Sequence, residues 1–141
     1  MKQLTVHQPC PCGRVVAGKG GKSMTYGVCC GRWLELQAVA VFPPDAESLM
    51  RSRYSAFVLE REAYLLQSWV ADQRPVSIEF DAGVKWLGLD VRAHRQTGPD
   101  TAEVEFVARQ KSNGGPAMRL HERSRFVRQD GRWLYVDGDT L

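Results

Sequence analysis

The chain has 141 residues, enough for one domain with a sizeable core and too few for two such cores. Its 43% apolar and 25% charged residues are ordinary for a folded protein in water, and they exclude a disordered or membrane-spanning class. The net charge of +3 is carried by the N-terminal third and is too small to indicate nucleic-acid binding by itself. Residues 1–8 lack the apolar stretch of a signal peptide, so we expect a cytoplasmic protein with no membrane partner.

Four cysteines lie near the N-terminus as two close pairs, Cys10 with Cys12 and Cys29 with Cys30. Because a cytoplasmic chain keeps its thiols reduced, metal binding is favoured over disulfides. Zn²⁺ prefers thiolate or imidazole ligands in a closed tetrahedron, which makes the four sulfurs a candidate zinc site. The spacing is tighter than the common Cys-x₂-Cys knuckle, and two alternatives stay open: buried free thiols, or a redox pair. His7 is a candidate replacement for one of the cysteine ligands.

Sixteen residues separate the two cysteine pairs, and residues 17–27 have the glycine content of a loop. Residues 16–23 end in Gly-Lys-Ser, as a phosphate-binding P-loop does. However, Val16 stands where that motif needs its first glycine, and no strand–loop–helix unit surrounds it. We therefore expect a mobile basic loop between the cysteine pairs.

Two helices are predicted after the cysteine segment. Pro43 and Pro44 precede Asp45, a good N-cap, and apolar residues then recur at helical spacing, which predicts a helix over about residues 45–59. A shorter amphipathic helix over about residues 64–69 should end before Pro75. We place the domain boundary ahead of these helices, with a cysteine module over 1–34 and a main domain over 35–141.

From residue 76 the apolar pattern changes to period two, and turn signals interrupt it at 97–100, 113–116 and 130–131. The expected strands cover about 77–80, 85–94, 102–111, 118–128 and 133–137. Short turns between consecutive strands produce an antiparallel meander, and the two preceding helices can cover one of its faces. The sequence therefore predicts an α+β fold with helices packed on a four- to five-stranded antiparallel sheet.

Glu122 is a carboxylate on an otherwise apolar strand face. An unpaired buried charge is costly, so we expect a partner, and Arg53 beside the apolar face of the first helix is the natural one. The favoured interpretation is a buried ion pair that fixes the helix on the sheet. The alternative is a pocket in which Glu122, Arg53, Tyr54 and Ser124 meet a small molecule.

Large aromatic residues on the sheet, namely Trp86, Trp133 and Tyr135, are expected in the core. We expect a basic stripe on an exposed surface of the sheet, made of His121, Arg123, Arg125 and Arg128. Glu103 and Glu105 on the neighbouring strand should neutralise this stripe by cross-strand pairing, which leaves nucleic-acid binding a minor hypothesis.

Two sets of residues resemble known families. Cys-Pro-Cys-Gly at residues 10–13 and Tyr-Gly-Val-Cys-Cys-Gly at 26–31 resemble the SEC-C motif, known from the C-terminal tail of the SecA translocation ATPase. Residues 49–57, 122–126 and 131–138 closely resemble the bacterial YchJ family, whose function is uncharacterised. The chain departs from the motif in the long gap between its cysteine pairs, where a short turn is usual.

The resemblance implies one structural zinc ion on the sulfurs of Cys10, Cys12, Cys29 and Cys30, because four cysteines leave no open coordination position. It also implies a cone-shaped, nuclear transport factor 2-like (cystatin-like) fold and a protein partner for the cysteine module. We hypothesise a zinc-binding adaptor rather than an enzyme and assign no catalytic residue. The alternatives are an enzyme or small-molecule binder that uses the cavity of the cone, and a nucleic-acid or ribosome-associated protein.

Overall fold

The computed structural model describes residues 2–18, 20–35 and 41–141. A short 3₁₀ helix, η1 (Tyr26–Val28), and the one-turn helix α1 (Gly31–Leu34) follow the cysteine-rich N-terminal segment. Two further helices, α2 (Ala46–Val58) and α3 (Glu62–Gln67), precede four strands. The strands are β1 (Val84–Gly98), β2 (Thr101–Ser112), β3 (Ala117–Gln129) and β4 (Arg132–Thr140). None of the helices in the described ranges is long and apolar enough to cross a membrane.

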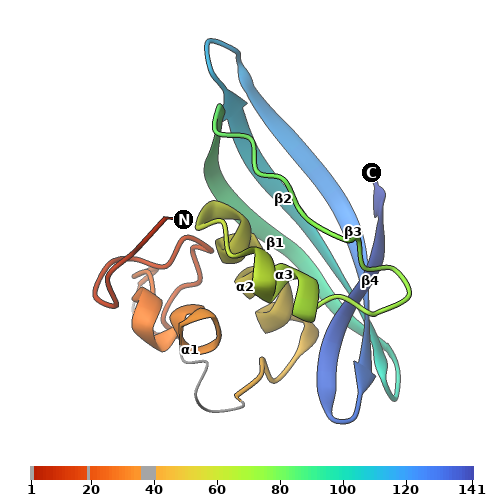
Figure 1. The fold of residues 1–141 in the computed structure, drawn as a ribbon. Coiled ribbons are helices and arrows are strands. Elements are labelled where there is room, and N and C mark those ends of the chain that lie inside the picture. Colours follow the sequence, from red (N-terminus) through yellow and green to blue (C-terminus); the bar gives the residue numbers. More distant parts are fainter. Residues whose placement is uncertain (1, 19, 36–40) are drawn as a thin grey trace.

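The strands form one antiparallel sheet in the order β1-β2-β3-β4, which is the predicted meander. Figure 1 shows α2 and α3 on one face of the twisted sheet, with the N-terminal segment and α1 beside them. The α+β prediction is therefore confirmed. Register shifts near Gly88 and at Arg125–Phe126 mark β-bulges, which increase local twist and bend a sheet around what packs against it.

Helix α2 begins as predicted, because the Asp45 side chain accepts a hydrogen bond of 2.7 Å from the backbone N–H of Ser48. One face of α2 carries Ala46, Met50 and Tyr54 into a core shared with the sheet. The opposite face meets the cysteine segment and α3, through Ala56 among other residues.

Burial on both sides explains the serines inside α2, of which Ser52 and Ser55 are fully enclosed. The Ser52 hydroxyl lies 2.7 Å from the Leu49 carbonyl oxygen and 2.6 Å from the Tyr64 hydroxyl, so its polarity is satisfied locally. Small side chains let the neighbouring segments approach α2 closely. The helix is thereby fixed between two cores.

The predicted strand over 77–80 is wrong. These residues join no ladder, and the backbone N–H of Ile78 donates 2.8 Å to the Glu62 carboxylate of α3 instead of to a strand. Ile78 and Phe80 still pack on the core, so the alternating pattern reflected burial rather than sheet pairing. The other four predicted strands are confirmed, and each extends beyond its expected range, most of all β1 and β4 at their C-terminal ends.

Candidate metal centre and ligand cavity

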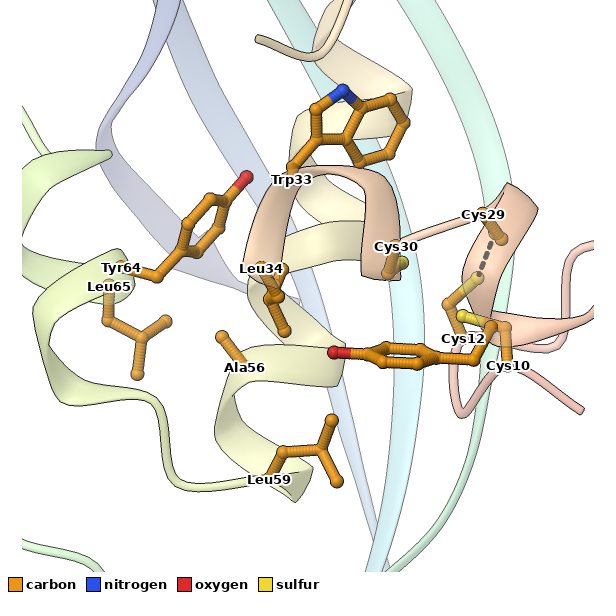
Figure 2. Close-up of a cluster of buried hydrophobic side chains, with 11 residues drawn as sticks. Cys10, Cys12, Cys29, Cys30, Trp33, Leu34, Ala56, Leu59, Tyr64 and Leu65 are labelled. Atoms are coloured by element: carbon orange, nitrogen blue, oxygen red, sulfur yellow. Dashed lines mark hydrogen bonds between the residues drawn. The ribbon is translucent and has the colours of Figure 1, made fainter. Parts of the chain in front are cut away.

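The four cysteines come together at one buried point. Their sulfur atoms all lie within 4.8 Å of one another, and those of Cys12 and Cys29 are 3.6 Å apart. Each cysteine is at most 4% exposed, and all four are free thiols. Figure 2 shows the four side chains converging, with the dashed line joining Cys12 to Cys29. The cluster can therefore hold a metal ion.

The 16-residue insertion does not separate the pairs, because it folds back on itself. Antiparallel bridges join Pro9 to Thr25 and Val15 to Ser23. The Cys10 backbone N–H also donates 2.9 Å to the Met24 carbonyl oxygen. The insertion is therefore a narrow hairpin whose base holds the two cysteine pairs side by side, where the sequence had predicted only a loop.

Two hypotheses on this segment can be placed in the structure. Ser23 is bridged to Val15, and the next helical element is the single 3₁₀ turn η1, which begins only at Tyr26, so Ser23 does not open the helix on which a P-loop holds phosphate. His7 is exposed in a turn and is not part of the sulfur cluster.

The thiols of the cluster differ in the direction of their pKa shifts. Hydrogen bonds from the thiols of Cys12, Cys29 and Cys30 hold the pKa of Cys10 far below its usual value. Burial raises the pKa of Cys30 well above the usual value of a cysteine thiol. Four enclosed sulfurs of this kind cannot all ionise next to one another unless a positive ion compensates them.

Helix α2 contacts the cysteines through polar side chains. The Cys10 sulfur lies 3.7 Å from the Ser55 hydroxyl, and the Arg51 guanidinium donates 3.1 Å to the Cys12 carbonyl oxygen. Arg51 is in turn held by Glu47 at 2.8 Å. Ser55 and Arg51 were not among the predicted site residues. Their helical spacing places both on one side of α2, but the sequence does not say which side meets the cysteines.

A second feature is a cavity of about 310 Å³ between α2, the residues after α3 and the sheet. All four predicted pocket residues, Arg53, Tyr54, Glu122 and Ser124, line it. The other walls are mainly apolar and aromatic, with Met50, Phe57, Trp69, Trp86, Phe106, Ala108, Leu120, Phe126 and Tyr135. Of the three aromatic residues expected in the core, Trp133 is buried there, whereas Trp86 and Tyr135 line this cavity.

The predicted ion pair between Arg53 and Glu122 is wrong. Arg53 instead donates through Nη1 to the Leu65 carbonyl oxygen at 2.8 Å and to the Ser68 hydroxyl at 2.7 Å, both near the end of α3. Its guanidinium carbon lies 4.5 Å from the ring centre of Tyr135 and 5.0 Å from that of Trp69. The end of α3 offers Arg53 acceptors closer than the sheet does, because orphan carbonyl groups gather where a helix ends.

Glu122 is left without a cation. It is half-buried, and burial raises the pKa of its carboxyl above the ordinary value. In the described part of the chain no basic group lies within ion-pair distance of it. Tyr54, on the opposite wall, has a pKa raised to about 12, mainly by burial. The cavity therefore combines a buried cation, an unpaired carboxyl group and aromatic surfaces.

The basic stripe on the outer face is neutralised, although only partly by the predicted partners. Glu105 lies 2.8 Å from His121 and 3.6 Å from Arg123, as expected from the β2–β3 register. Arg125 instead pairs with Asp137 and Asp139 of β4, each at 2.6 Å. Arg128 of the stripe pairs with Asp100. Glu103, the other predicted partner, pairs with Arg95 of β1 instead of with the stripe.

Comparisons with known proteins point to one family. The family model described as "YchJ, middle NTF2-like domain" matches residues 45–138. A UPF0225 protein of Polaromonas sp. is 65% identical over 131 residues, which cover 93% of this chain and 92% of that protein. A UPF0225 protein of Bordetella pertussis is 53% identical, with 92% of this chain and 91% of the relative covered.

Two solved structures have the same architecture. One is a SEC-C motif containing protein of Rhodopseudomonas palustris, with a TM-score of 0.76, 30% identity and coverage of 95% of this chain and 99% of that one. The other is a SEC-C motif containing protein of Psychrobacter arcticus, with a TM-score of 0.77, 30% identity and coverage of 94% and 82%. Fold and site thus define an NTF2-like α+β domain joined to a cysteine cluster. The chain belongs to the YchJ family, as its sequence motifs predicted.

Proposed function

We propose that the four cysteines hold one zinc ion and that its role is structural. Four sulfurs about 2.3 Å from a central zinc ion lie about 3.8 Å apart along each tetrahedral edge. The 3.6 Å between the sulfurs of Cys12 and Cys29 is close to this edge. A set of four cysteine ligands leaves no position for water or substrate, so the site would supply no chemistry beyond holding the chain. Both solved structures of similar fold belong to SEC-C motif containing proteins, the motif that the cysteine segment resembles, and this supports a metal site.

The centre would brace the wall of the cavity. Ser55 and Arg51, which contact the cysteine segment, share α2 with Arg53 and Tyr54, which line the cavity. A fixed cysteine segment therefore restrains the helix that forms one side of the cavity. This connects the metal centre to the main domain without giving it a role in catalysis.

We further propose that the main domain binds a small organic molecule in this cavity. The observation that carries the proposal is a cavity of about 310 Å³ with aromatic walls and two convergent charged side chains, Arg53 and Glu122. Ligand sites typically have this combination of apolar walls and a few polar groups, from about 300 Å³ upward. Binding is favoured over catalysis because Glu122 has no neighbouring group of the described chain that would orient it as an acid or base.

Elemental analysis of the purified full-length protein tests the zinc site. We expect one zinc per chain in the native protein and loss of zinc in Cys29→Ser, since one thiolate ligand is removed. A Cys→Ser change elsewhere is not possible as a control, because all four cysteines belong to the cluster. Ser112→Ala, at the exposed end of β2, serves as the control. Well-folded native protein without metal would overturn the assignment.

The cavity is tested with the uncharged fluorescent probe N-phenyl-1-naphthylamine. We expect saturable binding with a fluorescence increase, abolished in Ala108→Trp, because Ala108 lines the cavity and a large ring fills it. The control Val136→Trp adds the same ring to β4, at a residue outside this cavity, and should bind normally. Equal binding by both variants would show that the probe binds elsewhere.

A protein partner for the cysteine module is a second candidate, supported by its surface. Val6, Val15 and Val28 are 51%, 52% and 56% exposed, and the Gly27 backbone N–H bonds the Val6 carbonyl oxygen at 2.9 Å, which sets Val6 beside η1. We expect Val6→Ser with Val28→Ser to lose a partner that wild type retains in affinity capture from lysate. Identical captured proteins would count against this surface.

A further inference from the structure

Arg53 is a buried cation without an anionic partner. Its side chain is on α2, the residue is 6% exposed, and its charge faces the rings of Trp69 and Tyr135. Burial lowers its pKa to about 10, which still leaves it charged at neutral pH. No carboxylate of the described residues forms an ion pair with it. Its neighbours therefore shield the charge but do not neutralise it.

One edge of the guanidinium has unused donors. The two hydrogens of Nη1 are taken by the Leu65 carbonyl oxygen and the Ser68 hydroxyl. Nε and Nη2 make no hydrogen bond to any residue in the described ranges. Neither is sealed from solvent, because the only enclosed unpaired side-chain nitrogen or oxygen in those ranges is Nε1 of Trp69. Arg53 lines the cavity, so this accessible edge is the part of its side chain left to meet a molecule bound there.

The free edge has a specific chemical preference. Nε–H and Nη2–H point in parallel and match the two oxygens of a carboxylate, which is the strongest hydrogen-bonding arrangement that arginine makes. The surrounding walls suit a flat apolar body. Tyr54 and Phe57 lie 5.6 Å and 6.1 Å from the Trp86 ring, so several ring faces and edges border the space.

The charge balance favours an anion over an organic cation. Arg53 keeps its charge in the interior, and a cationic ligand would add a second uncompensated charge beside it. Glu122 is only half-buried, and burial raises its pKa, so it takes up a proton more readily than an ordinary glutamate. It therefore attracts a cationic ligand less strongly than the buried charge of Arg53 attracts an anion. A protonated Glu122 can also donate a hydrogen bond to a ligand.

We propose that the cavity binds a small organic acid, a flat ring-bearing molecule whose carboxylate accepts hydrogen bonds from Nε and Nη2 of Arg53. This inference rests on the proposed function, because it names the ligand class of the same cavity. The nearest alternatives are a neutral apolar ligand and an organic amine held by Glu122.

Three matched probes separate these possibilities: 2-naphthoate, its uncharged amide 2-naphthamide, and the cation 2-naphthylmethylammonium. Quenching of the tryptophan fluorescence follows binding to the full-length protein, since Trp69 and Trp86 line the cavity. We expect 2-naphthoate to bind at least about tenfold tighter than the amide, the effect of a charge-assisted pair of hydrogen bonds. The cation should bind most weakly of the three.

Variants test whether Arg53 causes the preference for 2-naphthoate over its amide. Arg53→Lys keeps the charge but loses the two-pronged edge, so the ratio of 2-naphthoate to amide affinity should fall to about threefold or less. Arg128→Lys is the matched control, because Arg128 also stacks on an aromatic ring, 5.3 Å from Trp133, but bonds Asp100 outside the cavity. Its ratio should match wild type. The comparison of probes on the wild type stands even where Arg53→Lys folds poorly.

Each outcome decides the matter. Amide binding equal to 2-naphthoate, with both blocked by Ala108→Trp, would overturn the organic-acid inference and leave the cavity as a binding site. Preference for the cation would overturn it in favour of Glu122. Failure of these three probes while N-phenyl-1-naphthylamine still binds would overturn the acid inference alone. Failure of all four probes to bind the wild type would overturn the cavity function itself, and the acid inference with it.

Discussion

Arg53 offers the sharpest test of how α2 is held on the rest of the protein. We predict that Arg53→Met lowers the free energy of unfolding by about 2–3 kcal/mol, as expected when a buried acceptor loses a charged donor and two ring contacts are lost. The Leu65 carbonyl oxygen would keep only the 3.2 Å bond from Ser68 in place of the 2.8 Å bond from Arg53. Removal of a poorly compensated buried charge offsets part of the loss, which is why the net value stays below the sum of the lost contacts.

Double-mutant cycles then distinguish the observed contacts from the ion pair that the sequence had predicted. Arg53 and Ser68 touch at 2.7 Å, so Arg53→Met with Ser68→Ala should show a coupling energy of about 1 kcal/mol or more. Arg53→Met with Glu122→Gln should be additive within about 0.5 kcal/mol, because the two side chains do not pair. Urea unfolding followed by tryptophan fluorescence measures all the variants. A coupling above about 1 kcal/mol between Arg53 and Glu122 would refute this description of the cavity.

Three further predictions concern single groups. Burial raises the folded-state pKa of Glu122 above 4.5, so its stabilising contribution is complete below that pH and is lost as the pH rises through the raised value. Between pH 4.5 and about pH 8 the unfolding free energy of Glu122→Gln should therefore rise relative to that of wild type. A difference between the two unfolding free energies that does not change with pH would contradict this. Tyr26→Phe removes a bond of 2.9 Å to Glu35 and should cost about 1 kcal/mol in urea unfolding, so an unchanged midpoint would show that water replaces it. Gly31→Ala places a Cβ 2.6 Å from the Tyr26 carbonyl oxygen, so it should cost about 2 kcal/mol in unfolding free energy and speed the release of the proposed zinc ion to a chelator. Gly115→Ala, whose Cβ meets nothing closer than 3.5 Å, should change neither quantity.

Local sequence signals predicted those elements whose hydrogen bonds close within a short stretch of chain. Asp45 predicted the start of α2 because an N-cap acts on a residue three positions later, Ser48. The turns predicted the four-stranded meander because consecutive strands pair through them. The same reasoning failed for residues 77–80, where burial produced the alternating pattern but the Ile78 N–H found a side chain of α3.

The candidate sites divide in the same way. The sequence alone showed four thiols in two close pairs and favoured a metal site over disulfides, but it left buried free thiols and a redox pair open. It also indicated that Arg53, Tyr54, Glu122 and Ser124 meet in one place, because helical and strand periods assign each of them to an inward face.

Only the tertiary structure decided which of these groups bond and which stay free. Arg53 has five N–H groups and a long side chain, and its choice of the α3 end over Glu122 depends on where α3 stops and on how α2 lies between two cores. The hairpin that closes the long gap between the cysteine pairs likewise rests on bonds between residues as far apart as Cys10 and Met24. Such contacts depend on distance in space, which the periodicity of a sequence does not contain, and they leave one edge of the Arg53 guanidinium without a hydrogen-bond partner among the described residues.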